Sequence, residues 1–226
     1  MPARLRPTAP IAADAILVGD PGRALLLAQE LLEQPKMSNH ARGLWGYSGL
    51  TPAGRELTIQ STGMGGPSAA VVLQDLAELG VRRAIRVGTC TALWDFDLGD
   101  LVIVTETFPE PGGFFQRAPE EEDLQQAVAP DPRLTLQLVR ALAGEAAGVV
   151  SVSLDVIHQP DQEVHPAAEV ADMQTAALFA VAAEFEMAIA ALLIVASTAD
   201  GDSLSDEGLE RKAKRAGAAA SAILST

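Results

Sequence analysis

An arginine and two glycines stand where an apolar run meets a helical pattern near the N-terminus. The run Ala15–Val18 ends in the motif GDPGR, residues 19–23, and apolar residues at helical spacing follow at once. Unpaired backbone N–H groups and the helix dipole attract anions at such a junction, and a guanidinium can bind two phosphate oxygens together. The motif therefore predicts an anion site, although an ordinary strand-to-helix turn with a surface arginine explains it equally well.

A second arginine, Arg86, lies inside an apolar strand pattern that ends in Gly88-Thr89-Cys90. A charge in such a strand is costly unless it is paired, so a buried ion pair is one interpretation. Gly88 and Thr89 also offer backbone and hydroxyl donors at the end of the strand. Since Arg23 supplies a second guanidinium from another strand end, we favour an oxyanion site over a purely structural pair.

A glycine-rich stretch and two acidic stretches follow other strand patterns. STGMGGPS, residues 61–68, allows the backbone to approach a ligand closely, but it lacks the P-loop lysine and the spacing of a dinucleotide fingerprint. Asp200 ends the last strong strand, where a carboxyl whose pKa is raised by burial could act as a general acid, or simply cap a turn. Asp172-Met173-Gln174 opens an alanine-rich helix, where a polar residue either caps the helix or meets a ligand's hydroxyl groups.

Strand and helix patterns alternate along the chain, and they must position these motifs. We expect strands at residues 15–18, 57–62, 83–88, 101–105, 148–153 and 187–196, and helices at 23–33, 67–79, 134–143, 174–184 and 204–224. Residues 108–132 are rich in proline, glycine and glutamate and are predicted to form a long surface loop. The alternation implies one α/β domain over residues 1–226, with a mostly parallel sheet covered by helices. Ligands of such folds bind at the carboxyl ends of strands, so the motifs should share a pocket.

Composition narrows the class of protein. The chain carries 30 acidic against 16 basic residues, and this net charge of −14 argues against a nucleic-acid partner. Cys90 is the single cysteine, which excludes a disulfide framework, and His40, His158 and His165 lack metal-ligand spacing, so we predict no metal site. No signal-peptide core opens the chain, and the longest apolar stretch, residues 187–196, is too short for a bilayer. We therefore expect a cytoplasmic protein without a membrane partner.

Four ordered stretches resemble the nucleoside phosphorylase family, whose members include bacterial purine nucleoside phosphorylase and uridine phosphorylase. They are VGDPGRA, RGLWGYSG, STGMGGPSAAVVLQDLAELG, and IRVGTCTAL with LGDLVIVT, in register from about Ile16 to Thr107. The resemblance resumes at residues 150–161, 172–179 and 194–200. It implies a single-domain, three-layer α/β/α fold around a central mixed, largely parallel sheet.

The resemblance also implies an activity and roles for particular residues. The activity is phosphorolysis, in which a nucleoside and phosphate give a free base and a pentose 1-phosphate, with inorganic phosphate as co-substrate and no cofactor. The implied phosphate ligands are Gly19, Arg23, Arg86 and Thr89 of one subunit and Arg42 of a neighbour, in a hexamer built as a trimer of dimers. The implied ribose contacts are Met64, Met173 and Gln174, and the implied base contacts are Cys90, Ile157 and His158. Asp200, assisted by Arg211, would protonate a purine at N7.

Three departures from the family pattern modify these expectations. Gln174 stands where the family has a glutamate that accepts hydrogen bonds from the sugar 2′- and 3′-hydroxyls, so we expect a hold on ribose weaker by roughly 1–2 kcal/mol. A different sugar, or loss of activity, are the alternatives at this position. Val164 replaces an arginine with which uridine enzymes read uracil, and Ile157-His158 replaces the aromatic pair that flanks the base in purine enzymes. Val164 counts against uracil, and Asp200, which the uridine enzymes lack, favours a purine.

Three functions remain for comparison. A purine-preferring nucleoside phosphorylase is the leading hypothesis. A hydrolytic nucleosidase with the same fold would use water and would not need Arg23, Arg42 and Arg86. A nucleoside- or base-binding protein without catalysis is favoured only by Gln174 and the altered base pocket.

Overall fold

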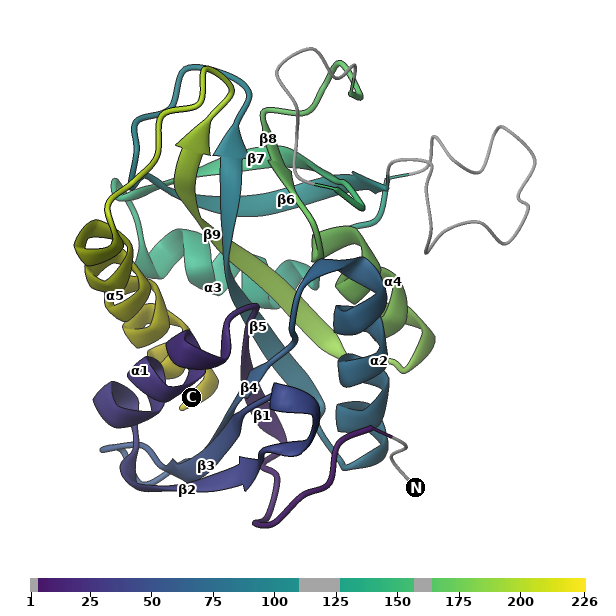
Figure 1. Ribbon diagram of the computed structural model, residues 1–226, viewed down its shortest axis with the longest axis vertical. Coiled ribbons are helices and arrows are strands. Elements are labelled where there is room, and N and C mark those ends of the chain that lie inside the picture. The colour runs from purple at the N-terminus through teal and green to yellow at the C-terminus, as the bar shows by residue number, and fades with distance from the viewer. Residues whose placement is uncertain (1–3, 110–126, 157–163) are drawn as a thin grey trace.

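The computed structural model describes residues 4–109, 127–156 and 164–226 (Figure 1). Its strands are β1 (Asp14–Val18), β2 (Glu33–Asn39), β3 (Gly46–Leu50), β4 (Glu56–Ser61), β5 (Arg83–Ala92), β6 (Leu101–Pro109), β7 (Ala146–Ser153), β8 (Val170–Asp172) and β9 (Ala188–Thr198). Its α-helices are α1 (Pro21–Leu31), α2 (Gly65–Glu78), α3 (Pro132–Ala141), α4 (Thr175–Glu184) and α5 (Asp206–Leu224), and a 3-10 turn, η1, spans Ala41–Gly43.

The described strands form one mixed sheet in the order β2-β3-β4-β1-β5-β8-β7-β6-β9. Strand β5 also pairs with β9 in parallel over most of its length, so β5, β8, β7, β6 and β9 close into a ring. Strand β1 pairs in parallel with both β4 and β5, whereas the outer pairs β2–β3 and β3–β4 are antiparallel. The predicted mixed α/β fold is therefore confirmed.

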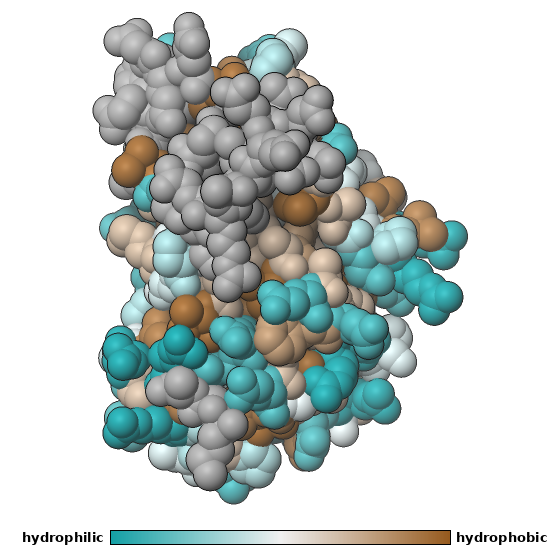
Figure 2. All heavy atoms as spheres, turned by 90° about the vertical axis from the view of Figure 1, so that its right-hand side faces the viewer, coloured by the Kyte–Doolittle hydropathy of each residue, from teal (hydrophilic) through white to brown (hydrophobic). Residues whose placement is uncertain are grey.

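Helices cover both faces of the sheet. Figure 1 shows α1 and α5 on one side of the strands and α2 and α4 on the other. Alternation along β1 explains why both faces are buried: Leu17 packs in the cluster with α2 and α4, and Ile16 packs with α1 and α5. Hydrophilic residues gather on the lower part of the face shown in Figure 2, which lies to the right in Figure 1.

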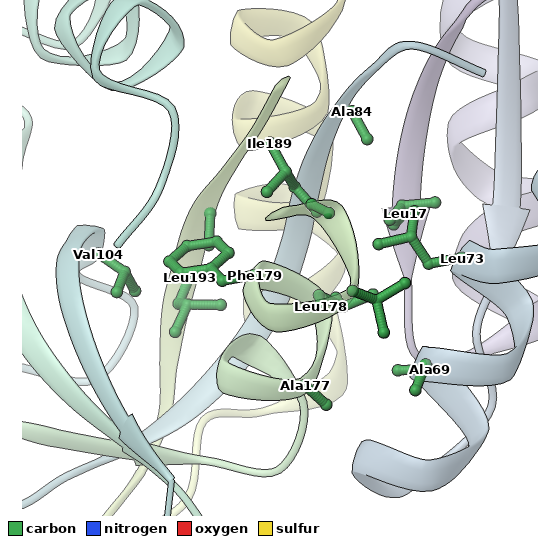
Figure 3. Close-up of a cluster of buried hydrophobic side chains, with 14 of the residues drawn as sticks. Leu17, Ala69, Leu73, Ala84, Val104, Ala177, Leu178, Phe179, Ile189 and Leu193 are labelled. Atoms are coloured by element: carbon green, nitrogen blue, oxygen red, sulfur yellow. The ribbon is translucent and has the colours of Figure 1, made fainter. Parts of the chain in front are cut away.

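Helix α4 lies in the core, as its nearly continuous apolar sequence predicts. Leu178 belongs to the same buried cluster as Leu73 of α2, and Phe179 lies against Leu193 of β9 (Figure 3). Gly66 contributes to the close approach of the two helices, because a Cβ at this position would lie 3.3 Å from the Cβ of Ala177. The N-terminal ends of α2 and α4 are thereby fixed against each other, and part of the cavity described below lies there.

Several element boundaries differ from those expected. Helix α1 begins at Pro21, because the Asp20 side chain accepts hydrogen bonds from the backbone N–H groups of Gly22 and Arg23. Strand β2 contains Pro35, the residue predicted to end the preceding helix, and α1 already ends at Leu31. Proline is tolerated in β2 because this strand lies at an edge of the sheet.

Three strands were not predicted, and β5 and β6 both extend four residues beyond their expected ends. β2 is mostly polar, β3 contains two glycines, and β8 has only three residues. β5 runs on to Ala92, so Thr89 and Cys90 lie within the strand instead of following it. In the predicted loop of residues 108–132, Phe108 belongs to β6, and residues 110–126 lie outside the described residues. Within the described part of the chain, no helix combines the length and apolar character needed to cross a membrane.

Candidate active site

Segments at or after the ends of different strands meet around a cavity of about 490 Å³. They are the turn before α1, the turn before α2, the second half of β5, the residues leading into α4, and the end of β9. The lining includes Gly19, Arg23, Gly63, Met64, Gly65, Arg86, Thr89, Cys90, Thr91, Met173, Gln174 and Ser197. The expectation that strand-following motifs share a pocket is consistent with this arrangement, because each of these motifs contributes a residue to the lining, although Asp200 itself does not.

Arg23 brings a positive charge to this cavity. The side chain is half-buried, and among the described residues no hydrogen bond or ion pair involves its guanidinium. Burial lowers the pKa of Arg23, and the positive charge of Arg86 lowers it further, whereas the negative charge of Asp20 opposes both effects. The group nevertheless stays protonated, as arginine does in proteins. An anion that entered the cavity would offset this desolvated charge.

Arg86 is buried, with 4% of its surface exposed, and every nitrogen of its guanidinium has a partner. Nη2 donates to Asp172 Oδ2 at 2.8 Å, Nη1 to Gln174 Oε1 at 2.5 Å, and Nε to Thr175 Oγ1 at 3.2 Å. The two interpretations of Arg86 are thus not exclusive, because the residue forms a buried ion pair and also lines the cavity.

Gly88 makes room for this arrangement two residues further along β5. A Cβ at Gly88 would lie 2.7 Å from Cζ and Nη2 of Arg86, so a side chain here would collide with the guanidinium. The glycine therefore allows Arg86 to fold back along its own strand toward the start of α4. This steric requirement explains why position 88, in the sequence RVGT, is a glycine.

Asp172 organises the polar groups at the start of α4. Its carboxylate accepts hydrogen bonds from Ser153 Oγ at 2.5 Å and from Thr175 Oγ1 at 2.7 Å, besides that from Arg86. It also accepts from the backbone N–H groups of Gln174 and Thr175, which caps the helix. Sequence analysis did not identify Asp172 as the counter-ion. The available signal was a buried arginine that required a carboxylate, together with an acidic residue in an otherwise apolar stretch.

Gln174 connects the arginine to the glycine-rich turn. Its Oε1 accepts from Arg86 and lies 3.0 Å from the donating Thr62 Oγ1. Its Nε2 donates to the carbonyl oxygens of Gly63 at 2.7 Å and Gly65 at 3.3 Å. Both glycines have positive φ, +74° and +80°, so the turn has a conformation that other residues rarely adopt.

Four of the remaining predicted residues line the cavity, and two cannot be placed. Thr89, Met64, Met173 and Cys90 line the cavity. Burial strongly raises the pKa of the Cys90 thiol, so this side chain is protonated and forms part of the cavity wall. Ile157 and His158 lie outside the described residues.

Three predicted residues lie on the surface of the described chain. Asp200 lies in an exposed turn after β9, Arg211 is exposed on α5, and Arg42 is exposed on η1. None of them lines the cavity within this subunit. Arg42 has a left-handed backbone conformation (φ 60°). In the same loop, the backbone oxygen of Leu44 accepts a hydrogen bond at 2.9 Å from Nε2 of Gln60, which lies on β4. The loop that carries Arg42 is therefore held in a defined shape, and Arg42 does not line the cavity of its own subunit.

A pair of hydroxyl groups in the cavity was not predicted. Thr91 Oγ1 and Ser197 Oγ lie 2.8 Å apart, on β5 and β9. Both residues fall within motifs that the sequence marked, but the predicted end of β5 at residue 88 gave no basis for assigning Thr91 to a face of the strand. In the described residues, no group of three or more histidine, cysteine or acidic side chains is arranged to hold a metal ion.

Comparison with known proteins gives both a family and a fold. A family model described as the phosphorylase superfamily matches residues 14–226. DeoD-type purine nucleoside phosphorylases of Oceanobacillus iheyensis and Caldanaerobacter subterraneus subsp. tengcongensis are each 41% identical over 95 residues. Those 95 residues cover 41% of this chain and 40% of each relative, so the matches span less than half the length of these curated relatives.

Solved structures resemble the chain over nearly its whole length. Purine nucleoside phosphorylase of Toxoplasma gondii in complex with immucillin-H superposes with a TM-score of 0.79 and 21% identity, over 95% of this chain and 90% of that one. A structure from a study of two uridine phosphorylases of the oomycete Phytophthora capsici superposes with a TM-score of 0.82 and 20% identity. The match covers 99% of this chain and 94% of that one. At these identities the likeness shows the fold. With the family match over residues 14–226, it establishes that the chain belongs to the phosphorylase superfamily.

Proposed function

We propose that this protein is a nucleoside phosphorylase that cleaves the N-glycosidic bond of a purine nucleoside with inorganic phosphate. The observation that carries the proposal is the presence of Arg23 and Arg86 in one cavity, close enough for each charge to act on the other. Two guanidiniums from separate strands of an acidic protein favour a small anion with several oxygens, and phosphate matches their geometry. The named relatives support the same class of reaction.

In this proposal the cavity holds phosphate beside the sugar. Arg23 and the Thr89 hydroxyl bind the ion directly, and Arg86, which also lines the cavity, contributes its positive charge. A phosphate oxygen forms a bond to the anomeric carbon as the bond from that carbon to the base nitrogen breaks, and the base leaves with the electron pair. The bound dianion stabilises the cationic sugar of the transition state, and fixed positions lower the entropic cost of the attack.

The departing base must gain a proton. Asp200 remains our proposed donor for a purine, and Arg211 its proposed assistant, although both side chains are exposed in this structure. The exposed turn that contains Asp200 and Gly201 follows β9 directly, and Ser197 of β9 lines the cavity. Asp200 would therefore reach the base by a rearrangement of this turn alone.

The proposal is tested by incubating the protein with a panel of purine and pyrimidine nucleosides, with and without added phosphate. We expect release of purine bases that depends strictly on phosphate. Absence of base release from every nucleoside would contradict the proposal and would favour a binding protein, for which calorimetry would detect nucleoside binding without turnover.

Gly88→Ala is expected to weaken the use of phosphate, because the added methyl group displaces the Arg86 guanidinium. We expect KM for phosphate to rise by about tenfold or more, and the free energy of unfolding to fall by about 1–3 kcal/mol through overpacking. Initial rates at varied phosphate and urea denaturation give the two values. Gly148→Ala, on β7 outside the cavity, is the matched control and should leave KM for phosphate unchanged. An unchanged KM in both variants would show that the position of Arg86 does not matter for phosphate.

Arg42 is expected to complete the phosphate site of a neighbouring subunit in a homo-oligomer, which we propose to be a hexamer. Arg42→Ala should raise KM for phosphate without lowering the melting temperature, because the side chain is exposed in its own subunit. Co-expression of Arg42→Ala and Arg23→Ala subunits provides a sharper test. Each mixed two-fold dimer contains one site with both arginines, so about a quarter of all sites regain activity in a statistical mixture. Lack of recovery in mixed oligomers would contradict the shared site.

A further inference from the structure

Thr91 and Ser197 form a pair of hydroxyl groups in the cavity that the proposed mechanism does not use. Thr91 Oγ1 and Ser197 Oγ lie 2.8 Å apart, both residues are half-buried, and both line the cavity. Among the described residues, this is the one hydrogen bond that either hydroxyl makes. Two hydroxyl groups have two hydrogens and four lone pairs. Their mutual bond uses one hydrogen and one lone pair, so one donor and several acceptor positions remain for a ligand.

An extra residue in β9 brings the two hydroxyl groups together. Cys90 of β5 pairs with Val195 of β9, but the next residue, Thr91, pairs with Ser197, so Ala196 has no partner on β5. Without this shift of one residue, Thr91 would face Ala196, which has no hydroxyl group. Bulges of this kind are over-represented beside active sites, where they redirect a side chain. The irregularity of β9 is therefore what creates the hydroxyl pair at the cavity wall.

The pair lies on a part of the cavity wall that suits a base. Thr91 follows Thr89, the proposed phosphate ligand, by two residues on β5, so it faces the same side about 6–7 Å further along the strand. A displacement at the anomeric carbon places phosphate and base on opposite sides of that carbon, so a group one strand repeat beyond the phosphate can face the base. The lining residues nearby, Leu154, Ala171 and Ala196, are apolar, as walls around flat rings are.

A hydroxyl pair in this place can stabilise a departing base without giving up a proton. A base that leaves with the bonding electron pair gains negative charge, and a donor that is already oriented toward it stabilises that charge. One hydroxyl accepts from the other and donates to the base, and the first hydrogen bond polarises the second. Asp200 does not line the cavity, and the Cys90 thiol donates to the backbone oxygen of Ile194. Of the described side chains in this part of the lining, the pair is therefore the one with a hydrogen left to donate.

We propose that Thr91 and Ser197 act together as a hydrogen-bond donor to the departing base and stabilise the negative charge that it gains. The inference rests on the proposed function, because it concerns the leaving group of the same reaction. Both hydroxyl groups keep their protons: one hydrogen is shared with the base while the glycosidic bond breaks, and the final protonation of the base is a separate event. A base that leaves with more negative charge therefore depends more strongly on the pair.

The direct test compares two leaving groups in the native protein and in the double variant Thr91→Val/Ser197→Ala, at saturating phosphate. The base of inosine leaves with negative charge, whereas the base of 7-methylinosine is positively charged before cleavage and leaves as a neutral molecule. We expect kcat/KM for inosine to fall by about tenfold or more in the double variant, and kcat/KM for 7-methylinosine by less than about threefold. Equal losses for both nucleosides would show that the pair only shapes the cavity, and would overturn the inference.

The single variants test whether the two hydroxyl groups act as a unit. Each substitution leaves one hydroxyl without the partner that orients and polarises it, so Thr91→Val and Ser197→Ala should each cause most of the loss seen in the double variant. Losses that add fully in the double variant would contradict a cooperative pair. This comparison uses inosine alone, so it decides the inference even if 7-methylinosine is not cleaved.

Ser48 and Thr58 provide the matched control. Their hydroxyl groups lie 2.9 Å apart on the adjacent strands β3 and β4, and neither residue lines the cavity. Ser48→Ala removes the same atom as Ser197→Ala and should leave kcat/KM for both nucleosides unchanged. A comparable fall in this control would attribute the effect to loosening of the sheet and would overturn the inference. Failure of the native protein to cleave any nucleoside overturns the proposed function, whereas phosphorolysis that survives the double variant unchanged overturns this inference alone.

Discussion

Replacing Arg23 with alanine is expected to lower kcat/KM for phosphate by about two to three orders of magnitude, which corresponds to roughly 3–4 kcal/mol of lost charge-assisted hydrogen bonding. The effect is large because this guanidinium is half-buried and has no hydrogen-bonding or ionic partner among the described residues. Its whole hydrogen-bonding capacity is therefore available to the ion. Initial rates of base release at varied phosphate give the value.

The same substitution should leave the fold intact. Removing a partly desolvated cation that forms no ion pair with any described residue relieves a cost, so we expect the free energy of unfolding to change by less than about 1 kcal/mol. Arg23→Lys should recover part of the activity, because an ammonium keeps the charge but cannot bind two oxygens in parallel. Arg133→Ala, exposed on α3, is the control. Equal phosphate dependence in the Arg23→Ala and Arg133→Ala variants would contradict the account.

Replacing Asp172 with asparagine is expected to lower the free energy of unfolding by about 3–5 kcal/mol, the usual cost of leaving a buried charge without its counter-ion. Arg86 would keep contacts with Gln174 and Thr175, but both are neutral. The Asp172 carboxylate also accepts hydrogen bonds from backbone N–H groups at the start of α4, so the substitution weakens the cap of this helix. Urea denaturation followed by circular dichroism measures the change.

The Asp14–Arg83 pair provides the comparison for this prediction. It has similar distances, 2.7 and 2.8 Å, but 32% of the Arg83 side chain and 14% of the Asp14 side chain are exposed. Asp14→Asn should therefore cost only about 1 kcal/mol, as ion pairs in contact with solvent do. If the two asparagine variants were equally stable, the burial of Arg86 would not be the source of the effect.

The sequence predicted most of the core elements because their patterns are strong. The apolar run of β9 and the all-round apolar helix α4 are both buried as expected. Strands β2 and β3 were missed because they lie toward an edge of the sheet, where one face contacts solvent and the sequence is free to be polar. β8 was missed because three residues are too short to show a period. Tertiary pairing, which local pattern does not encode, determines all three.

Most of the candidate site was predictable from the rule that ligands bind where parallel strands end, which brought Arg23 and Arg86 to one cavity. What the sequence did not predict is how Arg86 is held. The ion pair with Asp172 joins two residues that are 86 positions apart in the sequence. The collision that Gly88 avoids depends on the path of the Arg86 side chain. Gln174 is a comparable case, because a glutamine in the sequence does not reveal that its side chain connects Arg86 to the carbonyl oxygens of Gly63 and Gly65.

The most direct test of the central claim is phosphorus-31 NMR of the native protein incubated with a purine nucleoside and inorganic phosphate. If the two arginines hold phosphate for attack on the sugar, a pentose 1-phosphate signal grows in step with released base, one for one, and inorganic phosphate declines equally. Base release with free pentose and an unchanged phosphate signal would show that water is the attacking group, and would contradict the account.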